Sequence, residues 1–571
     1  MSLGKYTRRG FLAASAATTL GLAGCATLPN NTAPQALRRF EDDAEESAVT
    51  GPEPGREPDL LLRDFYSASA IPVSDHAAAR AYLAPETAEQ WDPSESMLIV
   101  DRLDVTTQAG STDEQRTFRI VGSVIGSLLE GGSYTPENSV YEASVRMELV
   151  RGEWRISSVP NGVVMERMEL RNQYEPHNLY FFDTTHRVLV PDRRWLFAGE
   201  EQLDSVLLSL LLAGPAEYLR PGVDPALTPD ASFAGKSEGV YRFSGVSGLD
   251  EKERNLLGAQ LTWTLAEANI PAPYRFVADG APLVASLGEV VPDDFAEYNP
   301  RSTLSAGAPL YALTDGRLFE VTSSQTKALA NGLGQLDNLE SAALTVAGTG
   351  AAVQRAGEES VLHITTAEGG STDILRARTI SRPTFEYDAN AAWIVVDGRD
   401  VVRVVRSAAS AEVTQSDVNS AQLDALGGDI SMLRLSRTGV RVAMIIDGRV
   451  VLGVVSRPPN GPKEIVSVIE IARDLGGSAL SVEWQPDGSL LVGTATPETP
   501  VWRVEQDGSS VFALPAANIT APVVSVAANS TTMYATDARA ALQLPSGGGD
   551  NAIWREVPGL QGVRAAVIVA S

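Results

Sequence analysis

Residues 442–455 read VAMIIDGRVVLGVV, which is two apolar runs joined by the pair Asp447-Gly448. Because Asp-Gly supplies the positive backbone angles that tight hairpin turns require, this stretch predicts two antiparallel strands with a turn between them. The same pair stands between apolar runs at four further places: Asp315-Gly316, Asp397-Gly398, Asp487-Gly488 and Asp507-Gly508. We therefore predict that the C-terminal half of the chain is a series of short strands joined by tight turns.

The spacing of these strands indicates a structural repeat. Corresponding strands are predicted to start near Thr384, Ile430, Ala479 and Val523, which are 46, 49 and 44 residues apart. A period of about 45 residues is typical of a four-stranded propeller blade. Residues 298–571 would therefore form a β-propeller domain of about six blades, whose ends meet to close the ring. A pair of β-sandwiches is the alternative architecture.

Residues 172–297 combine helical and strand patterns, which predicts a small α+β domain. Apolar residues repeat at three and four positions from Leu203 to Leu211, and this helix must end at Gly214-Pro215 because proline cannot continue it. The pattern then predicts a strand over 239–243, a second helix over 251–268 and a closing strand over 273–277.

Residues 59–171 place helices before strands. Apolar residues at helical spacing predict short helices, and four later runs rich in β-branched and aromatic residues predict antiparallel strands. This order, which closes on Trp154-Arg155-Ile156, resembles the cone-shaped NTF2-like fold. Such cones can hold a ligand or a catalytic acid and base, and Asp75 with His76 is the candidate pair. The simpler interpretation is a solvated Asp-His at the start of a loop.

The N-terminal segment has the three parts of a bacterial lipoprotein signal. A basic start precedes a mild apolar run, and Leu22, Ala23 and Gly24 lead into Cys25, the only cysteine of the chain. Because the apolar run is too short to span a bilayer, we predict that residues 1–24 are a removable signal peptide and that Cys25 carries a diacylglycerol. The alternative is a soluble protein whose leftover cysteine follows an apolar leader.

Two routes of export remain open. Arg8 and Arg9 lie in a stretch that resembles the twin-arginine signal of proteins exported in the folded state, but paired arginines are also ordinary in basic leaders. After the predicted cleavage, residues 25–58 would form a flexible acidic linker, since they carry the run Glu41–Glu46 and little apolar content. Such a linker gives the folded domains reach above the membrane.

The charge of the chain narrows its range of partners. It has 72 Asp plus Glu against 46 Lys plus Arg, and loss of residues 1–24 would take its net charge from −26 to −29. A surface so acidic repels nucleic acid and anionic lipid headgroups, so attachment to a membrane must come from acyl chains. A single cysteine allows no internal disulfide, and stability must therefore rest on buried cores.

No catalytic group is predicted. Residues 235–239 match the nucleophile elbow around Ser237, but that motif needs a strand before the serine and a helix after it, whereas we expect a polar loop before it and a strand after it. Ser324 and Lys327 have the spacing of penicillin-recognising enzymes without the companion motifs, and we interpret them as part of a turn.

No metal site or cofactor is predicted either. The spacings of the histidines do not suit a metal site, and no calcium-binding loop of the Asp-x-Asp-x-Asp-Gly type occurs in the sequence. The four histidines are His76, His177, His186 and His363.

Two resemblances to known families complete the prediction. Leu211–Pro215, Gln260–Leu265 and Val277–Gly280 resemble the GerMN domain, a small extracytoplasmic module without established catalysis. The chain as a whole resembles the LpqB family of actinobacterial lipoproteins, with its order of NTF2-like, GerMN and propeller domains. The stretches that carry this second resemblance are Leu22–Cys25, Trp154–Ile156 with Pro160–Val163, Tyr180–Asp183, Leu189–Trp195 and Leu211–Pro215.

The LpqB resemblance implies a non-enzymatic protein on the outer face of the cell membrane. Its implied partner is the extracytoplasmic sensor region of a histidine kinase of the Mtr two-component system, whose signalling it would tune during growth and division. The twin-arginine-like leader departs from the family and bears only on the export route. Two other classes remain open: a cell-envelope hydrolase acting through carboxylates on propeller loops, and a passive cell-wall binding module.

Overall fold

A computed structural model describes residues 51–224, 231–301, 307–329, 332–365, 370–407, 412–458, 461–549 and 551–571. The predicted signal peptide and nearly all of the predicted linker lie outside these ranges. Within them, two domains of mixed helix and strand precede six four-stranded sheets. The predicted fold class, mainly β with two small α+β domains and a C-terminal propeller, is confirmed.

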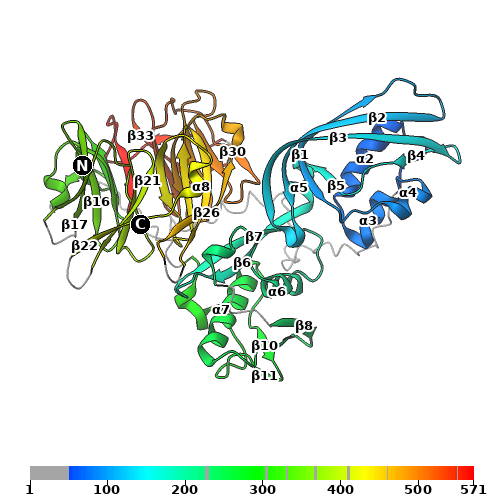
Figure 1. The fold of residues 1–571 in the computed structure, drawn as a ribbon, viewed down its shortest axis with the longest axis horizontal. Helices are drawn as coiled ribbons and strands as arrows, with labels where there is room; N and C mark the ends of the chain where they lie inside the picture. The colour runs from blue at the N-terminus through cyan, green and yellow to red at the C-terminus, as the bar shows by residue number, and fades with distance from the viewer. Residues whose placement is uncertain are drawn as a thin grey trace, which may run out of the picture. The chain divides into compact units, whose positions relative to one another are not determined.

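The N-terminal domain packs helices against one side of a five-stranded sheet of order β4-β3-β2-β1-β5 (Figure 1). Inward-facing Phe118 and Ile120 alternate with more exposed residues along β2, as a half-buried strand requires, and they share a core with Leu62 and Phe65 of the first helix. Its elements are α2 (Pro58–Ser69), α3 (Val73–Arg80), α4 (Pro85–Gln90), β1 (Met97–Thr107), β2 (Gln115–Leu128), η1 (Glu130–Gly132), β3 (Tyr134–Val150), β4 (Glu153–Ser158), β5 (Val163–Glu166) and α5 (Arg167–Gln173).

The second domain is built around a helix that is buried on all sides over residues 256–265. Asp250 and Glu253 form a capping box at the start of this helix, and its polar residues Gln260 and Thr264 bond to the backbone of Tyr180 at 3.0 and 3.1 Å. The elements are β6 (Tyr174–Phe182), β7 (Leu189–Phe197), α6 (Leu203–Ala213), η2 (Arg220–Gly222), β8 (Ser232–Ser237), β9 (Val240–Ser244), α7 (Glu251–Glu267), β10 (Arg275–Ala278), β11 (Ala281–Pro282) and η4 (Pro292–Tyr298).

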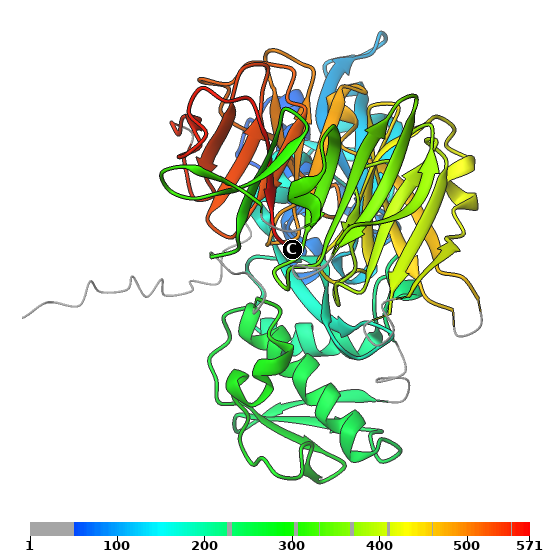
Figure 2. The same ribbon diagram turned by 90° about the vertical axis from the view of Figure 1, so that its left-hand side faces the viewer.

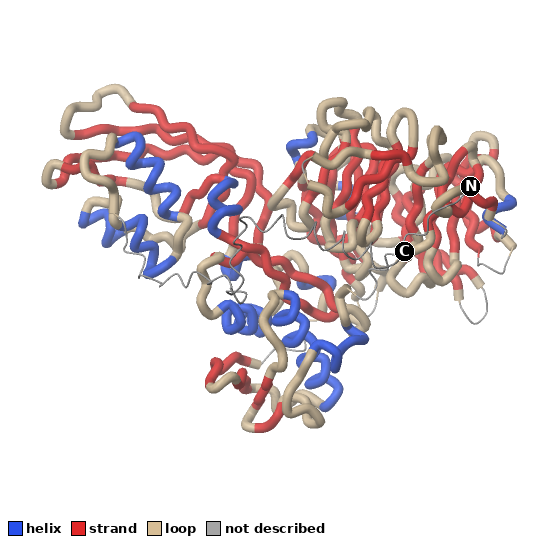
Figure 3. The backbone as a smooth tube through the Cα atoms, turned by 180° about the vertical axis from the view of Figure 1, so that it is seen from behind, coloured by secondary structure: helices blue, strands red, loops and turns tan. Residues whose placement is uncertain are grey.

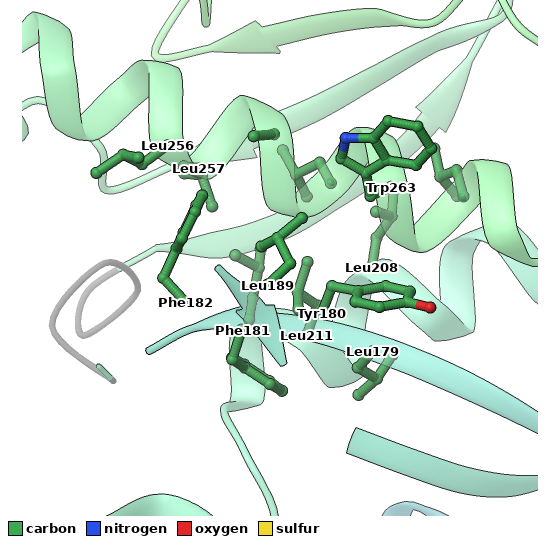
Figure 4. Packing of buried hydrophobic residues seen from close by; sticks show 14 of the residues in the cluster. Leu179, Tyr180, Phe181, Phe182, Leu189, Leu208, Leu211, Leu256, Leu257 and Trp263 are labelled. Carbon is green, nitrogen blue, oxygen red and sulfur yellow. The ribbon is translucent and has the colours of Figure 1, made fainter. Parts of the chain in front are cut away.

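Aromatic and leucine side chains fill the space between α6, α7 and the β6–β7 ribbon. Phe182 points toward Leu257 of α7, and Trp263 of the same helix lies across from Leu208 of α6 (Figure 4). Burying each such side chain contributes about 1.5–3 kcal/mol. The predicted helices over 203–211 and 251–268 are therefore confirmed, and each owes its stability to this shared core.

Strands joined by loops make up the propeller, and its few helices are short (Figure 3). Its short helices are η5 (Gly332–Gln335), α8 (Ala421–Asp424) and η6 (Arg473–Leu475). The first blade combines β12 (Leu310–Thr314), β13 (Arg317–Val321), β14 (Thr326–Ala328) and β35 (Ala566–Val569). The second has β15 (Leu339–Leu344), β16 (Gly350–Ala356), β17 (Glu359–Thr365) and β18 (Thr372–Ala377), and the third has β19 (Thr384–Phe385), β20 (Ala391–Val396), β21 (Asp400–Arg406) and β22 (Val413–Asp417).

The remaining blades follow in chain order. The fourth has β23 (Ile430–Leu435), β24 (Arg441–Ile446), β25 (Arg449–Ser456) and β26 (Glu464–Ile471). The fifth has β27 (Ala479–Trp484), β28 (Leu490–Thr494), β29 (Val501–Val504) and β30 (Val511–Ala513), and the sixth has β31 (Ser525–Ala528), β32 (Thr532–Thr536), β33 (Ala541–Pro545) and β34 (Arg555–Glu556). Three of the four predicted strand starts, Thr384, Ile430 and Ala479, begin strands, and the fourth strand begins two residues after Val523.

The last strand of the chain completes the first blade. β35 pairs antiparallel with β12, with Leu310 opposite Val569 and Leu313 opposite Ala566, so the red strand lies beside the green one (Figure 2). The ends of the ring meet as the repeat predicted. This closure satisfies the backbone of β12 on the side where an open sheet would have left an edge.

The Asp-Gly turns are of two kinds. At Asp315-Gly316, Asp397-Gly398 and Asp447-Gly448 both residues have positive φ, as predicted. At Asp487-Gly488 and Asp507-Gly508 only the glycine has a positive φ. The backbone N–H of Ser489 donates to the carboxylate of Asp487, and that of Ser509 to the carboxylate of Asp507, each at 3.0 Å. These two turns differ from the prediction because a side chain supplies the bond that closes them.

Replacing Gly448 by alanine is expected to destabilise the propeller strongly. A Cβ there would lie 1.9 Å from the backbone oxygen of Gly477, at a φ of +75°. At Gly357, where φ is +70° but no atom lies within 4 Å of the added Cβ, Gly357→Ala incurs only the backbone strain of about 1–2 kcal/mol. Urea unfolding should give Gly448→Ala a loss at least about twice that of Gly357→Ala. Equal losses would contradict the close approach of the two blades.

Candidate functional site

The second domain and the propeller share a buried apolar contact. Gly222 in η2 faces the fourth blade, where a Cβ at this position would lie 2.6 Å from Val440 Cγ1 and 2.8 Å from Val454 Cγ1. Both valines belong to the same cluster of buried residues as the core of the second domain. Glycine therefore lets the two backbones approach more closely than a side chain would allow.

Charged and polar side chains form the rest of the contact between the second domain and the propeller. We call this whole contact, apolar and polar parts together, the junction. Arg193 on β7 donates to Glu505 at 2.7 Å, and Trp195 Nε1 donates to Asp507 at 3.1 Å. Both carboxylates are only 7% exposed. Removal of one partner of a buried ion pair leaves a charge without compensation and costs about 3–5 kcal/mol. The junction therefore favours one arrangement of the second domain on the propeller.

Arg441 on β24 also belongs to the junction. Its Nη2 donates to the backbone oxygen of Pro191 at 2.7 Å and lies 3.5 Å from the hydroxyl of Tyr218, so it crosses from the propeller to the second domain. The residue is 3% exposed, and its Nε has no hydrogen-bond partner within the described ranges. Arg441 is thus a buried guanidinium held by uncharged groups.

The N-terminal domain contacts the propeller as well. Arg167 lies 3.4 Å from Asp474, and the guanidinium of Arg171 lies 4.6 Å from the centre of the Phe512 ring. A Cβ on Gly508 would lie 2.9 Å from the ring of Pro136. All three domains of residues 52–571 are therefore in contact.

Two of the stretches that suggested the LpqB resemblance, Tyr180–Asp183 and Leu189–Trp195, contribute to the junction. Within Tyr180–Asp183, the buried Asp183 accepts from the backbone of Val188 at 3.1 Å and lies 3.4 Å from Arg457 of the propeller. Within Leu189–Trp195, Arg193 and Trp195 reach the propeller. Asp192 instead accepts from Arg194 at 2.7 Å and from the backbone of Ala216 at 2.8 Å, both inside the second domain. Their unusual mixture of charge and apolar residues reflects this interdomain role.

A cavity of about 450 Å³ lies between the second domain and the propeller, and we call it the junction cavity. Its walls come from β6, β7, the end of α7 and the segment Tyr298–Arg301 on one side, and from loops of four propeller blades on the other. A volume of this size suits a small-molecule ligand. The arginines that line it were missed by sequence reasoning because they are far apart along the chain and follow no motif.

A smaller cavity of about 140 Å³ lies among the innermost strands of the blades. Arg382 lines it and lies 3.7 Å from Glu483. The same carboxylate contacts Arg434 at 2.8 Å. Burial, together with the neighbouring Arg434, lowers the pKa of Arg382 to about 10. One carboxylate is thus shared between two buried guanidinium groups.

The structure separates Asp75 from His76. Asp75 is exposed and pairs with Arg80 at 2.7 Å, whereas His76 is buried, donates to the backbone oxygen of Ser69 at 2.9 Å and packs edge-on against Trp91. Burial lowers the pKa of His76. Since His76 bonds to a backbone carbonyl and Asp75 to Arg80, the two do not form an acid and base pair. The simpler interpretation, a solvated Asp-His, is right for Asp75 and wrong for the buried His76.

Neither serine motif forms a nucleophile site. Ser237 ends strand β8 and a hairpin leads directly into β9, so no helix follows it. The polar loop predicted before Ser237 is wrong, because this polar segment is an edge strand whose only partner is β9. Ser324 lies in a bend between β13 and β14, which agrees with the predicted turn, and Lys327 lies within β14.

The histidines lie apart and have separate partners. His186 contacts Asp224, and His363 lies 3.0 Å from Gln354 and 3.1 Å from Asp373. Burial lowers the pKa of both His177 and His363. Among the residues that the structure describes, no three His, Cys, Asp or Glu side chains gather as a metal site would require.

The predicted lipid site lies outside the part of the chain that the structure describes. Cys25, the lipobox residues Leu22, Ala23 and Gly24, and the export residues Arg8 and Arg9 all lie outside the described ranges. Across those ranges, none of the helices has both the length and the apolar character needed to cross a membrane.

Fold and junction together define a class: multidomain β-propeller proteins in which two small α+β domains are joined to the propeller through buried contacts. Family models match each of the three domains. The model of the lipoprotein LpqB N-terminal domain matches residues 51–171, and that of the lipoprotein LpqB β-propeller domain matches residues 316–568. Between them, the Germane model, whose description is sporulation and spore germination, matches residues 178–284.

Relatives match over nearly the whole length. The chain is 41% identical to lipoprotein LpqB of Corynebacterium diphtheriae, over 97% of each chain, and 38% identical to that of Rhodococcus opacus, over 97% of this chain and 96% of the relative. The chain belongs to the LpqB lipoprotein family. Among solved structures, TolB from Acinetobacter baumannii matches 46% of this chain and 66% of its own chain at 13% identity, with a TM-score of 0.32.

Proposed function

We propose that the protein is a lipid-anchored extracytoplasmic accessory that binds the sensor region of an Mtr-type histidine kinase and modulates its signalling in cell-envelope growth and division. Membership of a lipoprotein family supports attachment to a membrane, with Cys25 as the attachment residue. Attachment at the outer face would bring the folded domains next to the extracytoplasmic part of a kinase.

The observation that carries this proposal is the buried junction. Because Arg193, Trp195 and Arg441 tie the second domain to the propeller, the two present their loops in a fixed relation. A surface that is already ordered loses little entropy when a partner docks. Loops on a rigid scaffold are also where binding residues concentrate.

A hydrolase is the less favoured candidate. A glycosidase needs two carboxyl groups that face one substrate, one of them kept protonated. In the junction cavity, Glu267 is held by Arg301 at 2.6 Å and Asp487 by Arg503 at 2.7 Å. These ion pairs suit binding better than proton transfer.

Loss of the lipid site should release the protein from membranes. Cys25→Ala removes the sulfur that would accept the diacylglycerol, and the acidic folded part has no electrostatic affinity for anionic headgroups. Cell fractionation should find this variant in the soluble fraction, whereas Thr27→Ala, which leaves the predicted lipobox intact, should stay with the membrane. A Cys25→Ala variant that still pellets with membranes would refute the anchor.

The mature protein should form a complex with the kinase sensor region at micromolar concentration. Co-purification of the two, with the sensor region of an unrelated histidine kinase as the control, tests this. Absence of a complex at micromolar concentration would contradict the proposal. Retention on purified peptidoglycan without kinase binding would favour the cell-wall module instead.

A further inference from the structure

We propose that the junction cavity binds a small molecule that carries two or more carboxylate or phosphate groups. The inference concerns the charge and geometry of the cavity alone, and it is independent of the kinase.

Arginines outnumber carboxylates among the residues that line the cavity. Five arginines line it, Arg187, Arg301, Arg437, Arg441 and Arg503, against three carboxylates, those of Glu267, Glu297 and Asp487. The chain as a whole carries a net charge of −26. Because the chain as a whole is acidic, this group of guanidiniums at one concave place is not part of a general basic surface.

Ion pairs account for only part of this excess. Arg301 is paired with Glu267, and Arg187 lies 3.6 Å from Asp388. Arg503 lies between Asp487 at 2.7 Å and Glu505 at 3.2 Å. Arg441 has no carboxylate within ion-pair distance in the ranges described and bonds to Pro191 and Tyr218, which are uncharged. A buried cation without a counter-charge is costly, and an anion in the cavity would lower that cost.

The positions of the arginines select the kind of ligand. Arg187 comes from the second domain, whereas Arg437 and Arg441 come from the fourth blade and Arg503 from the fifth. Each guanidinium can bind a carboxylate or phosphate through two parallel hydrogen bonds. A ligand with a single anionic group could reach one wall only, so the cavity favours one with several.

The remaining lining is suited to the body of such a ligand. Trp484, Tyr180 and Tyr387 contribute aromatic surface, and Gln485, Gln506 and Asn529 contribute amide groups. Occupancy would bridge the two walls and therefore stabilise the assembled domains by mass action.

Calorimetric titration of the mature protein at fixed ionic strength tests the proposal, with citrate and pyrophosphate as multivalent probes and acetate as the monovalent one. We expect citrate or pyrophosphate to bind at least about tenfold more tightly than acetate, a difference of about 1.4 kcal/mol, and to raise the unfolding temperature. The stronger of the two probes identifies the ligand as a carboxylate or a phosphate.

The double variant Arg187→Gln with Arg437→Gln should weaken that binding at least about tenfold. The side chain of Arg187 is 58% exposed, so its loss should leave the fold intact. Arg378→Gln is the matched control, since Arg378 is 82% exposed and lies outside the cavity. No binding of either multivalent probe at millimolar concentration, or an equal loss in the control, would overturn the proposal.

Discussion

The buried contact between Arg193 and Glu505, with Trp195 and Asp507 beside it, is the constraint on which the arrangement of the second domain depends. Charges taken out of water must be compensated, and here each of the two acidic side chains of the propeller finds its donor on strand β7. A rotation or shift of the second domain would remove Arg193 and Trp195 from these carboxylates and leave them only their contacts within the propeller, with Arg503 and Ser509. The apolar contact at Gly222 adds attraction, but the charged groups define the geometry.

The propeller makes this contact possible because it is a closed body. The pairing of β35 with β12 joins the two ends of the ring, so the loops of the fourth and fifth blades keep fixed positions. Glu505 and Asp507 follow β29 and reach the second domain from that fixed platform. The junction cavity lies in the same place, since two curved surfaces that touch at a few buried residues leave a hollow between them.

Local patterns of the sequence predicted the repeated part of the fold well. The turn at Asp447-Gly448 and the strand starts at Ile430 and Ala479 follow from residues close together in the chain. Strand β8 was predicted as a polar loop because its sequence is polar and shows no clear alternation of apolar and polar residues, as is common at the edge of a sheet. The turn at Asp487 differs from the predicted type because its carboxylate bonds to the backbone two residues on.

The candidate site could not be predicted in the same way. Arg193 and Glu505 are 312 residues apart, and Arg441 and Pro191 are 250 apart, so no pattern of spacing connects them. The sequence showed only that Leu189–Trp195 carries part of the LpqB resemblance, without its partner in the propeller. Within the N-terminal domain, His76 was a candidate by chemical type, but burial and its bond to a backbone carbonyl give it a structural role.

A double-mutant cycle on Arg193→Ala and Glu505→Ala tests the central claim most directly. The free energy of unfolding of the two single variants and the double variant gives the coupling energy of the pair, and Arg119 with Glu142, an exposed pair at 2.8 Å, provides the reference. The account predicts a coupling of at least about 1.5 kcal/mol for the junction pair and less than about 1 kcal/mol for the exposed pair. A junction coupling no larger than that of the exposed pair would contradict it.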